Sequence, residues 1–134
     1  MPVVNEIEGR KILVVEDDYL IASTMTEALM DEGVEVIGPA GSVETAIALV
    51  RGAPEIDGAL LDVNLRGEMA FAVADLLMDR GVPIVFTTGY DQTTIPPRYA
   101  HVTCCEKPTN FNVILVSLRN SMGLGRAPSF GLPM

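Results

Sequence analysis

Short runs of mainly apolar residues alternate along the chain with longer stretches in which apolar residues recur every three or four positions. The runs occupy residues 11–15, 34–38, 58–61, 82–86 and 102–105. Continuous apolar runs of this length are typical of strands buried on both faces of a parallel sheet, and the periodic stretches are typical of amphipathic helices. The alternation therefore predicts an α/β fold in which each of five strands is followed by a helix.

Capping residues help to place the helices. Asp18 and Ser42 are favoured N-cap residue types, so we expect helices to begin directly after them. Two further helices are expected at about residues 68–80 and 110–122. Residues 39–41, with the sequence Pro-Ala-Gly, are expected to turn the chain after the second strand.

The stretch between the fourth and fifth strands breaks the pattern, because Pro96 and Pro97 lie in its middle. Proline lacks a backbone donor and disfavours helix in the residue before it. Only a shortened fourth helix fits there, near residues 91–94.

The length of 134 residues and the apolar share of 49% fit one domain with a substantial core. We expect this domain at residues 10–122, with an N-terminal extension at 1–9 and a tail at 123–134 that is too short for an output domain. No run approaches the roughly 18 apolar residues of a membrane span, so no membrane insertion is expected. Cys104 and Cys105 are expected to be reduced thiols, which favours a cytoplasmic location.

The charge of the chain argues against one class of partner. Nine Lys and Arg against 18 Asp and Glu give a net charge of −9. Nucleic-acid binding draws most of its non-specific affinity from Lys and Arg that neutralise phosphates. We therefore expect no direct contact with nucleic acid.

Polar side chains stand at the ends of four predicted strands. Glu16 and Asp17 follow the first strand, and Asp62 follows the third. Thr88 and Lys107 follow the fourth and fifth. Because the carboxyl ends of parallel strands meet at one edge of a sheet, where ligands bind, these side chains are expected to converge. Taken singly, the acids could instead be a solvated helix start, and Thr88 and Lys107 would be ordinary surface residues.

Three acids at one edge suit a divalent cation. Mg²⁺ prefers oxygen ligands and takes one or two carboxylates with water and phosphate oxygens. Asp17 and Asp62 can supply carboxylates, and Glu16 can hold a metal-bound water. The backbone carbonyl of Asn64 can reach the same ion. The cation would relieve the repulsion among the carboxylates and leave Asp62 ionised, able to attack phosphorus.

Lys107 and Thr88 complete a set of groups for phosphoryl transfer. Catalysis of this transfer is mainly positioning and charge stabilisation. Mg²⁺ would cover one phosphoryl oxygen, the Lys107 ammonium a second and the Thr88 hydroxyl a third. Lys107 precedes Pro108, and a cis bond there could aim the ammonium into the site.

Four segments carry a family resemblance. They are residues 14–18 (Val-Val-Glu-Asp-Asp), 60–65 (Leu-Leu-Asp-Val-Asn-Leu), 87–89 (Thr-Thr-Gly) and 106–108 (Glu-Lys-Pro). With them the chain resembles a response-regulator receiver domain of bacterial two-component signalling, of the stand-alone single-domain type, over about residues 10–122. The resemblance implies a flavodoxin-like, doubly wound parallel sheet with strand order 2-1-3-4-5.

The resemblance also implies a role for each site residue. Asp62 would accept phosphate from a sensor histidine kinase or a histidine phosphotransfer protein. Glu16 and Asp17 would hold Mg²⁺. Thr88 would be the switch hydroxyl, and Lys107 would contact the phosphate. Such a protein is not an enzyme acting on other substrates: it catalyses only its own phosphorylation and dephosphorylation, and signals through a protein partner or a phosphorelay.

Two features concern the output of such a domain. Receivers usually carry an aromatic residue three positions before the lysine, and Cys104 stands there. We hypothesise that Thr88 still moves on phosphorylation and that the loop at residues 89–98 is the element that changes. Tyr90 and Asn64 would flank the water that hydrolyses the phospho-aspartate, although a surface position without a kinetic role is an equal alternative for Tyr90.

Two other functions stay open. A Mg²⁺-dependent phosphohydrolase would also use an aspartyl nucleophile, but phosphatases of the haloacid-dehalogenase type place a second Asp two residues later, where this chain has Asn64. Turnover of a phosphomonoester would favour that function. A degenerate receiver would bind its partners without phosphate, and an Asp62→Asn variant that signals like the wild type would favour it.

Overall fold

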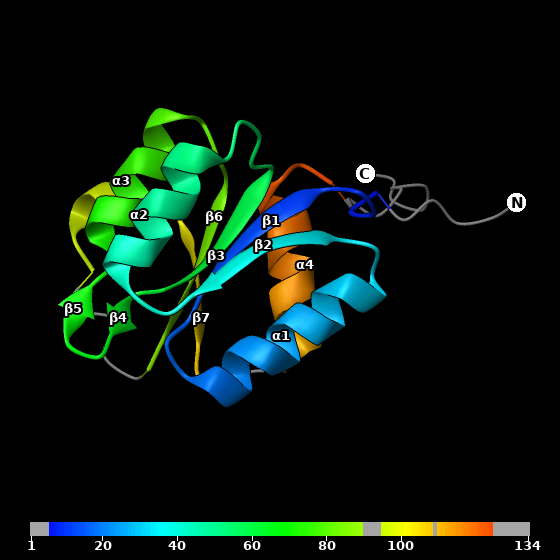
Figure 1. The fold of residues 1–134 in the computed structure, drawn as a ribbon, viewed down its shortest axis with the longest axis horizontal. Helices are drawn as coiled ribbons and strands as arrows, with labels where there is room; N and C mark the ends of the chain where they lie inside the picture. The colour runs from blue at the N-terminus through cyan, green and yellow to red at the C-terminus, as the bar shows by residue number, and fades with distance from the viewer. Residues whose placement is uncertain (1–5, 90–94, 109, 125–134) are drawn as a thin grey trace, which may run out of the picture.

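A five-stranded parallel sheet forms the centre of the computed structural model, which describes residues 6–89, 95–108 and 110–124 (Figure 1). From one edge to the other the strands are β2 (Glu35–Ala40), β1 (Lys11–Val15), β3 (Gly58–Asp62), β6 (Ile84–Thr88) and β7 (Thr103–Glu106). This is the predicted order 2-1-3-4-5, because the two short strands between β3 and β6 form a separate hairpin outside the sheet. The predicted flavodoxin-like fold class is confirmed. β6 and β7 start and end one or two residues later than predicted, so Thr88 belongs to β6.

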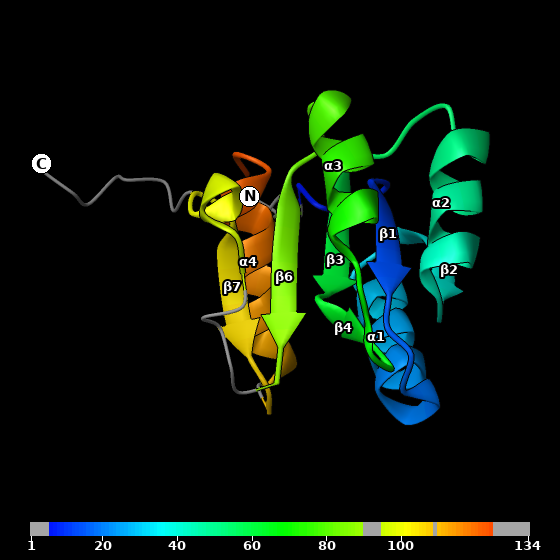
Figure 2. The ribbon, with the colours of Figure 1, turned by 90° about the vertical axis from the view of Figure 1, so that its left-hand side faces the viewer.

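Helices cover both faces of the sheet. α1 (Tyr19–Asp31) and α4 (Phe111–Ser121) lie on one face, and α2 (Val43–Gly52) and α3 (Phe71–Asp79) lie on the other (Figures 1 and 2). Because both faces are buried, the central strands are continuously apolar rather than alternating. No helix within the described ranges has both the length and the apolar character that crossing a membrane requires.

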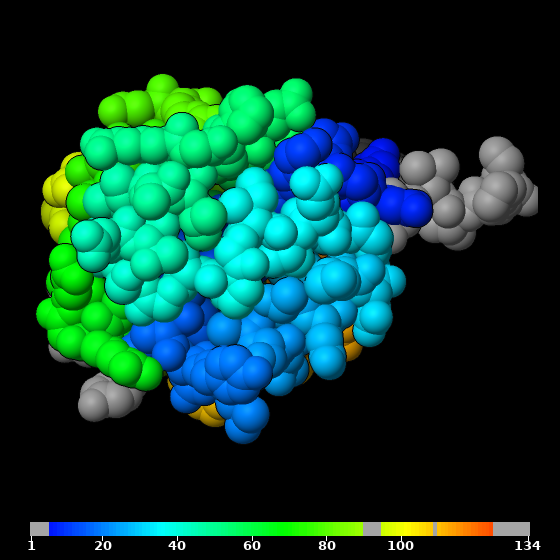
Figure 3. Space-filling view, in the orientation of Figure 1, coloured from blue at the N-terminus to red at the C-terminus, as the bar shows by residue number. Residues whose placement is uncertain are grey.

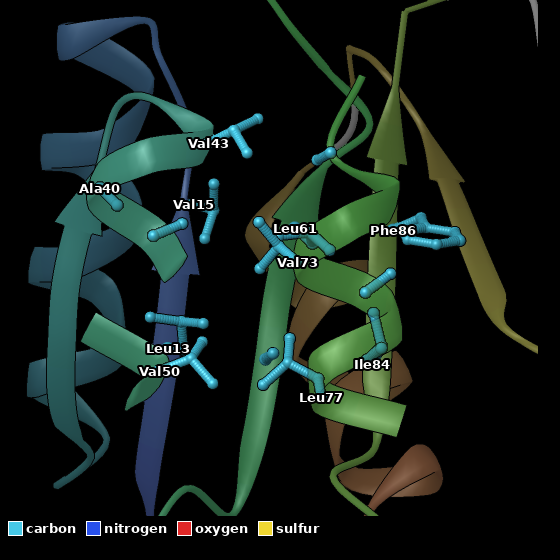
Figure 4. Packing of buried hydrophobic residues seen from close by; sticks show 14 of the residues in the cluster. Leu13, Val15, Ala40, Val43, Val50, Leu61, Val73, Leu77, Ile84 and Phe86 are labelled. Atoms are coloured by element: carbon cyan, nitrogen blue, oxygen red, sulfur yellow. The ribbon is translucent and has the colours of Figure 1, made fainter. Parts of the chain in front are cut away.

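Side chains of the central strands alternate between two cores. Leu13, Leu61 and Phe86 enter the core beneath α2 and α3 (Figure 4). Ile12 and Leu60 enter the core beneath α1 and α4. All five are at most 1% exposed. The edge strand β2 is less buried, and most of its residues are partly or fully exposed at the surface between α1 and α2 (Figure 3).

The predicted caps of the first two helices are confirmed. The backbone N–H of Ile21 donates to the Asp18 carboxylate over 3.1 Å. The backbone N–H of Thr45 donates to the Ser42 hydroxyl over the same distance, 3.1 Å. Each bond satisfies one of the backbone donors that have no partner within the first turn of a helix.

The third helix begins later than predicted, at Phe71 rather than at residue 68. The residues before it form a two-stranded antiparallel hairpin of β4 (Asn64–Leu65) and β5 (Glu68–Met69). Between these strands, Arg66 has φ 55° and Gly67 has φ 95°. Glycine adopts positive φ at little cost, so a tight turn forms here instead of a first helical turn.

The second strand runs further than predicted. Residues 39–41 do not turn the chain, because β2 continues to Ala40, which pairs with Val15 of β1. The Gly38–Pro39 bond is cis, and Gly38 has φ 103°. β2 lies at the edge of the sheet, where a strand tolerates proline because one side needs no backbone donor. The chain leaves the sheet only after Ala40.

The segment between β6 and β7 is only partly described. Residues 91–94, where a shortened fourth helix is predicted, lie outside the described residues, as do residues 90–94 of the loop at 89–98 and most of the predicted tail at 123–134. Directly before β7, a 3₁₀ helix, η2 (Pro97–Tyr99), begins with proline. Proline is tolerated there because the first N–H groups of a helix have no partner in it.

Candidate functional site

The carboxyl ends of three central strands gather the buried polar side chains. Within the described ranges, the buried polar or charged residues are Glu16, Asp62, Thr87 and Thr88, each at most 4% exposed. Glu16 follows β1, Asp62 ends β3, and the two threonines end β6. Burying polar groups costs free energy unless they find partners, so a cluster of them at one edge of the sheet needs an explanation.

Lys107, which follows β7, reaches into this cluster. Its Nζ lies 2.8 Å from Asp62 Oδ2 and 2.9 Å from Glu16 Oε1. Its backbone N–H donates to the Thr88 carbonyl over 2.7 Å. The Lys107–Pro108 bond is cis, an isomer that the sequence allows but does not decide. The structure thus brings the acids that follow β1 and β3 together with the lysine that follows β7.

Carboxylates of Glu16, Asp17 and Asp62 form a group that could hold a metal ion. One oxygen from each lies within 4.8 Å of the others. Mg²⁺ binds such oxygen donors and usually keeps water as well, so this set of donors fits it. The Asn64 N–H donates to Asp62 Oδ1 over 3.1 Å, which places Asn64 beside the site, and its carbonyl as a further ligand stays a prediction. Tyr90, predicted to flank the hydrolytic water, lies outside the described residues.

Burial and pairing act in opposite directions on the charges of the site. Burial raises the pKa of Glu16 to about 7, against the hydrogen bonds from Lys107 and from the Asp18 N–H, which lower it. Burial lowers the pKa of Lys107, but the hydrogen bonds to Asp62 and Glu16 outweigh it and the pKa rises. The lysine therefore stays charged, and the acids outnumber it. An added divalent cation would relieve their mutual repulsion.

Thr88 carries a buried hydroxyl without a partner. Its Oγ1 makes no hydrogen bond to any residue in the part of the chain that the structure describes. Thr88 lines a cleft of about 620 Å³ that Asp62 and Lys107 also line. An unsatisfied buried hydroxyl is destabilising by about 1–3 kcal/mol. A ligand with an acceptor oxygen in this cleft would supply the missing partner.

A second cavity, of about 610 Å³, adjoins the first and is mainly apolar. It lies between α1 and α4, where Leu20, Ile21 and Phe111 line it. Gly89 and Lys107 line both cavities. This cavity is not predicted from the sequence. The sequence gives only a weak signal for this cavity, the leucine at position 20 near the start of α1. Leucine is usually buried, but Leu20 is 70% exposed in the structure.

Arg66, which pairs with a predicted metal ligand, is also not predicted from the sequence as a residue of the site. Arg66 Nε lies 3.3 Å from Asp17 Oδ2, and Arg66 Nη2 donates to the Asp17 carbonyl over 3.4 Å. Gly67 was the available signal, because it marks a tight turn next to Arg66. It does not tell which side chain the turn would approach.

Tyr99 is buried near β7, the strand in which Cys104 stands at the position where receivers usually carry an aromatic residue. Cys104 in β7 is half-buried, whereas Tyr99 of η2 is 1% exposed. The Tyr99 ring stacks on Phe71 with a centroid distance of 5.2 Å and meets Phe86 edge-on at 5.5 Å. The Tyr99 hydroxyl donates to the Asp75 carboxylate on α3. This chain therefore fixes an aromatic ring from η2 rather than from β7.

Comparison with known proteins gives a family and two named relatives. A family model described as the response regulator receiver domain matches residues 12–119. Two curated relatives, each named transcriptional regulatory protein PdtaR, from two strains of Mycobacterium tuberculosis, are 31% identical over 90 residues. The match covers 66% of this chain and 43% of the relatives, so the chain spans less than half of their length.

Solved structures extend the comparison. The solution structure of SdrG from Sphingomonas melonis Fr1 is 32% identical, with a TM-score of 0.74 over 87% of this chain and 98% of that one. The BeF3-activated conformation of SdrG from Pseudomonas melonis Fr1 is 33% identical, with a TM-score of 0.66 over 80% of this chain and 93% of that one. A CheY-like receiver domain protein from Methanospirillum hungatei JF-1, 22% identical with a TM-score of 0.75, covers 87% of this chain and 95% of its own, and shares the fold.

Proposed function

Because the chain belongs to the response regulator receiver domain family, we propose that it is a Mg²⁺-dependent phospho-accepting switch and that Asp62 is the acceptor. One observation carries this proposal. Around the buried Asp62 carboxylate stand two further carboxylates, one ammonium and one hydroxyl without a partner. Cations and donors around a nucleophilic carboxylate are what phosphoryl transfer requires, because the transferred group spreads negative charge over its oxygens.

The proposed reaction starts from a phosphohistidine. An oxygen of the Asp62 carboxylate attacks phosphorus, the P–N bond breaks, and the imidazole leaves with the electron pair. The product is an aspartyl phosphate. Water later attacks that phosphorus, which releases inorganic phosphate and restores the carboxylate.

The surrounding residues would divide the positioning between them. Mg²⁺, held by Asp17 and Asp62 with Glu16 beside it, would supply positive charge to one phosphoryl oxygen. Lys107 would turn its ammonium from Asp62 to a second oxygen. Thr88 would donate its unpartnered hydroxyl to a third, which would satisfy that buried group in the phosphorylated state.

The phosphoryl donor would be a sensor histidine kinase or a histidine phosphotransfer protein. A donor histidine must come within bonding distance of Asp62, so the donor protein must cover the mouth of the cleft. The apolar cavity between α1 and α4 shares Lys107 and Gly89 with that cleft, so it offers adjoining surface for such a protein. The relative SdrG has a conformation described as BeF3-activated, and BeF3⁻ on a carboxylate imitates a phosphoryl group, which supports activation by phosphorylation here.

The geometry favours a switch over a phosphohydrolase. An aspartyl phosphatase needs a proton-transferring group near its nucleophile. Asn64 stands two residues after Asp62, and its amide oxygen accepts from the Gly67 N–H over 2.6 Å. An amide held in this way transfers no proton. We therefore propose that its only catalysis is its own phosphorylation and dephosphorylation. We also propose that the protein acts in the cytoplasm, through a protein partner or a phosphorelay.

Intact mass after incubation with Mg²⁺ and acetyl phosphate tests the proposal. We expect the wild type to gain one phosphoryl group and Asp62→Asn to gain none. Asp57→Asn, which removes another aspartate of the described chain, is the matched control and should gain one. Equal phosphorylation of wild type and Asp62→Asn, or none of either, would overturn the proposal.

A further inference from the structure

Arg66 contacts the one carboxylate of the acidic group that Lys107 does not contact. Lys107 contacts Glu16 and Asp62 at 2.9 Å and 2.8 Å. Arg66 contacts Asp17, through Nε at 3.3 Å from Oδ2 and Nη2 at 3.4 Å from the carbonyl oxygen. Each carboxylate of the group therefore has a cationic partner in the structure.

The backbone holds Arg66 in this place at a cost. Its φ of 55° lies in the left-handed region, which side chains other than glycine rarely adopt, and it is the one non-glycine residue of the described ranges to do so. Hydrogen bonds connect the turn to the acceptor. The Asn64 N–H donates to Asp62 Oδ1 over 3.1 Å, and Asn64 Oδ1 accepts from the Gly67 N–H over 2.6 Å. The turn that carries Arg66 is thus built onto the acceptor aspartate itself.

The charges decide which cation a metal ion would displace. With all three acids ionised, three carboxylates face two cations, which leaves one negative charge. Adding a divalent ion would turn this into an excess of one positive charge, so one of the cations becomes unfavourable. The Lys107 side chain is 23% exposed and holds two buried acids, whereas the Arg66 side chain is 79% exposed. An exposed ion pair is worth little, so Arg66 is the cation that costs less to release.

A second feature indicates that the cleft takes a ligand. Thr88, 4% exposed, lines the same cleft as Arg66 and Asp17, and its hydroxyl has no hydrogen-bond partner within the described residues. The arginine pair alone does not satisfy the polar groups of the cleft. These contacts fit a resting state in which the Arg66 guanidinium neutralises a carboxylate that would otherwise bind a metal ion.

We propose that Arg66 is a placeholder cation: it neutralises Asp17 in the metal-free protein, Mg²⁺ releases it, and this competition sets the affinity for Mg²⁺. The inference rests on the proposed function, since it takes Asp17 as a ligand of Mg²⁺. It goes beyond that function because it assigns a regulating residue outside the acids, the threonine and the lysine. Weaker Mg²⁺ binding in the resting protein would make phosphorylation depend on the concentration of the ion.

Calorimetric titration with Mg²⁺ tests the competition. Arg66→Gln keeps a side chain of similar shape and the same backbone strain but removes the charge, and it should lower the Kd for Mg²⁺ about two- to fivefold, as the loss of an exposed competing pair predicts. Arg66→Lys should lie between Arg66→Gln and the wild type. Arg98→Gln, which breaks an exposed arginine–aspartate pair outside the cleft, is the control and should bind Mg²⁺ like the wild type. High salt should narrow the difference, because it screens exposed pairs.

NMR gives a second readout, whose main measurement uses the wild type. In the wild type, the Nε–Hε resonance of Arg66 should shift as Mg²⁺ is added, with the same midpoint as the calorimetric titration. It should not shift in Asp17→Asn. A Kd for Arg66→Gln equal to or higher than that of the wild type, or an Arg66 resonance that does not shift when Mg²⁺ is added, would overturn the inference.

The outcomes separate this inference from the proposed function. If the wild type binds Mg²⁺, Asp17→Asn does not, and Arg66→Gln binds like the wild type, then only the role of Arg66 fails. If the wild type shows no binding that depends on Asp17, then the metal site of the proposed function fails and the placeholder fails with it.

Discussion

Two clusters of charged side chains differ in burial and in charge balance. The flank cluster, between α3 and η2, consists of Asp75, Arg98 and Tyr99, and the edge cluster, at the carboxyl ends of the strands, consists of Glu16, Asp17, Asp62 and Lys107. The flank cluster pairs one acid with one base, both about half exposed. In the edge cluster three acids face Lys107 and, at Asp17, the exposed Arg66, and the side chains of Glu16 and Asp62 are 1% and 5% exposed.

The pKa values follow this difference. In the flank cluster, hydrogen bonds from Tyr99 and Arg98 lower the pKa of Asp75, and burial raises the pKa of Tyr99 to about 12, so each group keeps the form that its partner needs. In the edge cluster, burial raises the pKa of Glu16 to about 7. Strongly perturbed groups gather at functional sites. Imbalance of charge and burial, rather than the presence of ion pairs, distinguish the proposed phosphorylation site from the flank cluster.

The largest expected effect comes from removing the base of the edge cluster. Lys107→Ala should slow phosphorylation by acetyl phosphate about 10³-fold, because a positioned charge is lost from the transition state. Arg98→Ala removes the base of the flank cluster and should leave the rate unchanged. Intact mass over time measures both rates. Similar losses in the two variants would contradict the comparison.

A smaller effect is expected from the hydroxyl that lines the cleft. Thr87 and Thr88 both carry a buried Oγ1 without a partner in the described residues, but Thr87 lines the apolar cavity instead. Thr88→Val should slow phosphorylation roughly 10- to 100-fold through the loss of one neutral donor, and Thr87→Val should not.

Urea unfolding supplies the control for the threonine pair. Neither variant should lower the free energy of unfolding, because each removes a hydroxyl that has no partner to lose. A rate loss of the same size in both variants would show that the strand, not the Thr88 hydroxyl, is responsible.

In the flank cluster the expected effect is on stability alone. Tyr99→Phe removes the hydroxyl whose single proton is donated to Asp75, and whose oxygen also lies 3.1 Å from the Phe71 carbonyl oxygen. It should lower the free energy of unfolding by about 1.5–3 kcal/mol, as expected for a hydrogen bond to a charged group. Urea unfolding near neutral pH measures the loss, and phosphorylation should proceed at the wild-type rate. An unaltered free energy of unfolding, or slowed phosphorylation, would contradict the separation of the two clusters.

The smallest expected effect is a change in the pH dependence of stability. The pKa of Asp75 lies below its ordinary value of 3.8, mainly through the Tyr99 hydrogen bond and next through Arg98. The folded state therefore binds fewer protons near that value than the unfolded state does, and this stabilisation is present above the unfolded pKa and lost as the pH falls through the lowered folded pKa. Asp75→Asn should be less stable than the wild type near neutral pH, and the gap should close in acid. Urea midpoints across the acid range measure it, and a gap that stays constant would count against this assignment.

Features set by local pattern could be predicted from the sequence. Continuous apolar runs place the five strands, and single residues such as Asp18 and Ser42 fix where helices begin. Parallel strands share a carboxyl edge, so the meeting of Asp62 and Lys107, 45 residues apart, follows from strand order. The family resemblance supplied that order and the expected roles, because periodicity does not distinguish one order of parallel strands from another.

Features set by how one loop lies on another could not be predicted. The contact between Arg66 and Asp17 depends on a two-residue hairpin turn with two positive φ angles, and the sequence pattern there resembles the start of a helix. The pairing of Tyr99 with Asp75 depends on where η2 lies against α3. Cys104 signals that the usual aromatic residue is absent from β7, but not that another ring is buried nearby.

The central claim is that Asp62, and no other side chain of the edge cluster, takes the phosphoryl group. Borohydride reduces an aspartyl phosphate at its acyl carbon to homoserine, so reduction of the phosphorylated chain followed by peptide mass mapping identifies the acceptor. We predict homoserine at position 62 with Glu16 and Asp17 unmodified. Reduction at position 17 instead, or a phosphoryl group that resists borohydride and maps to Thr88, would contradict the account.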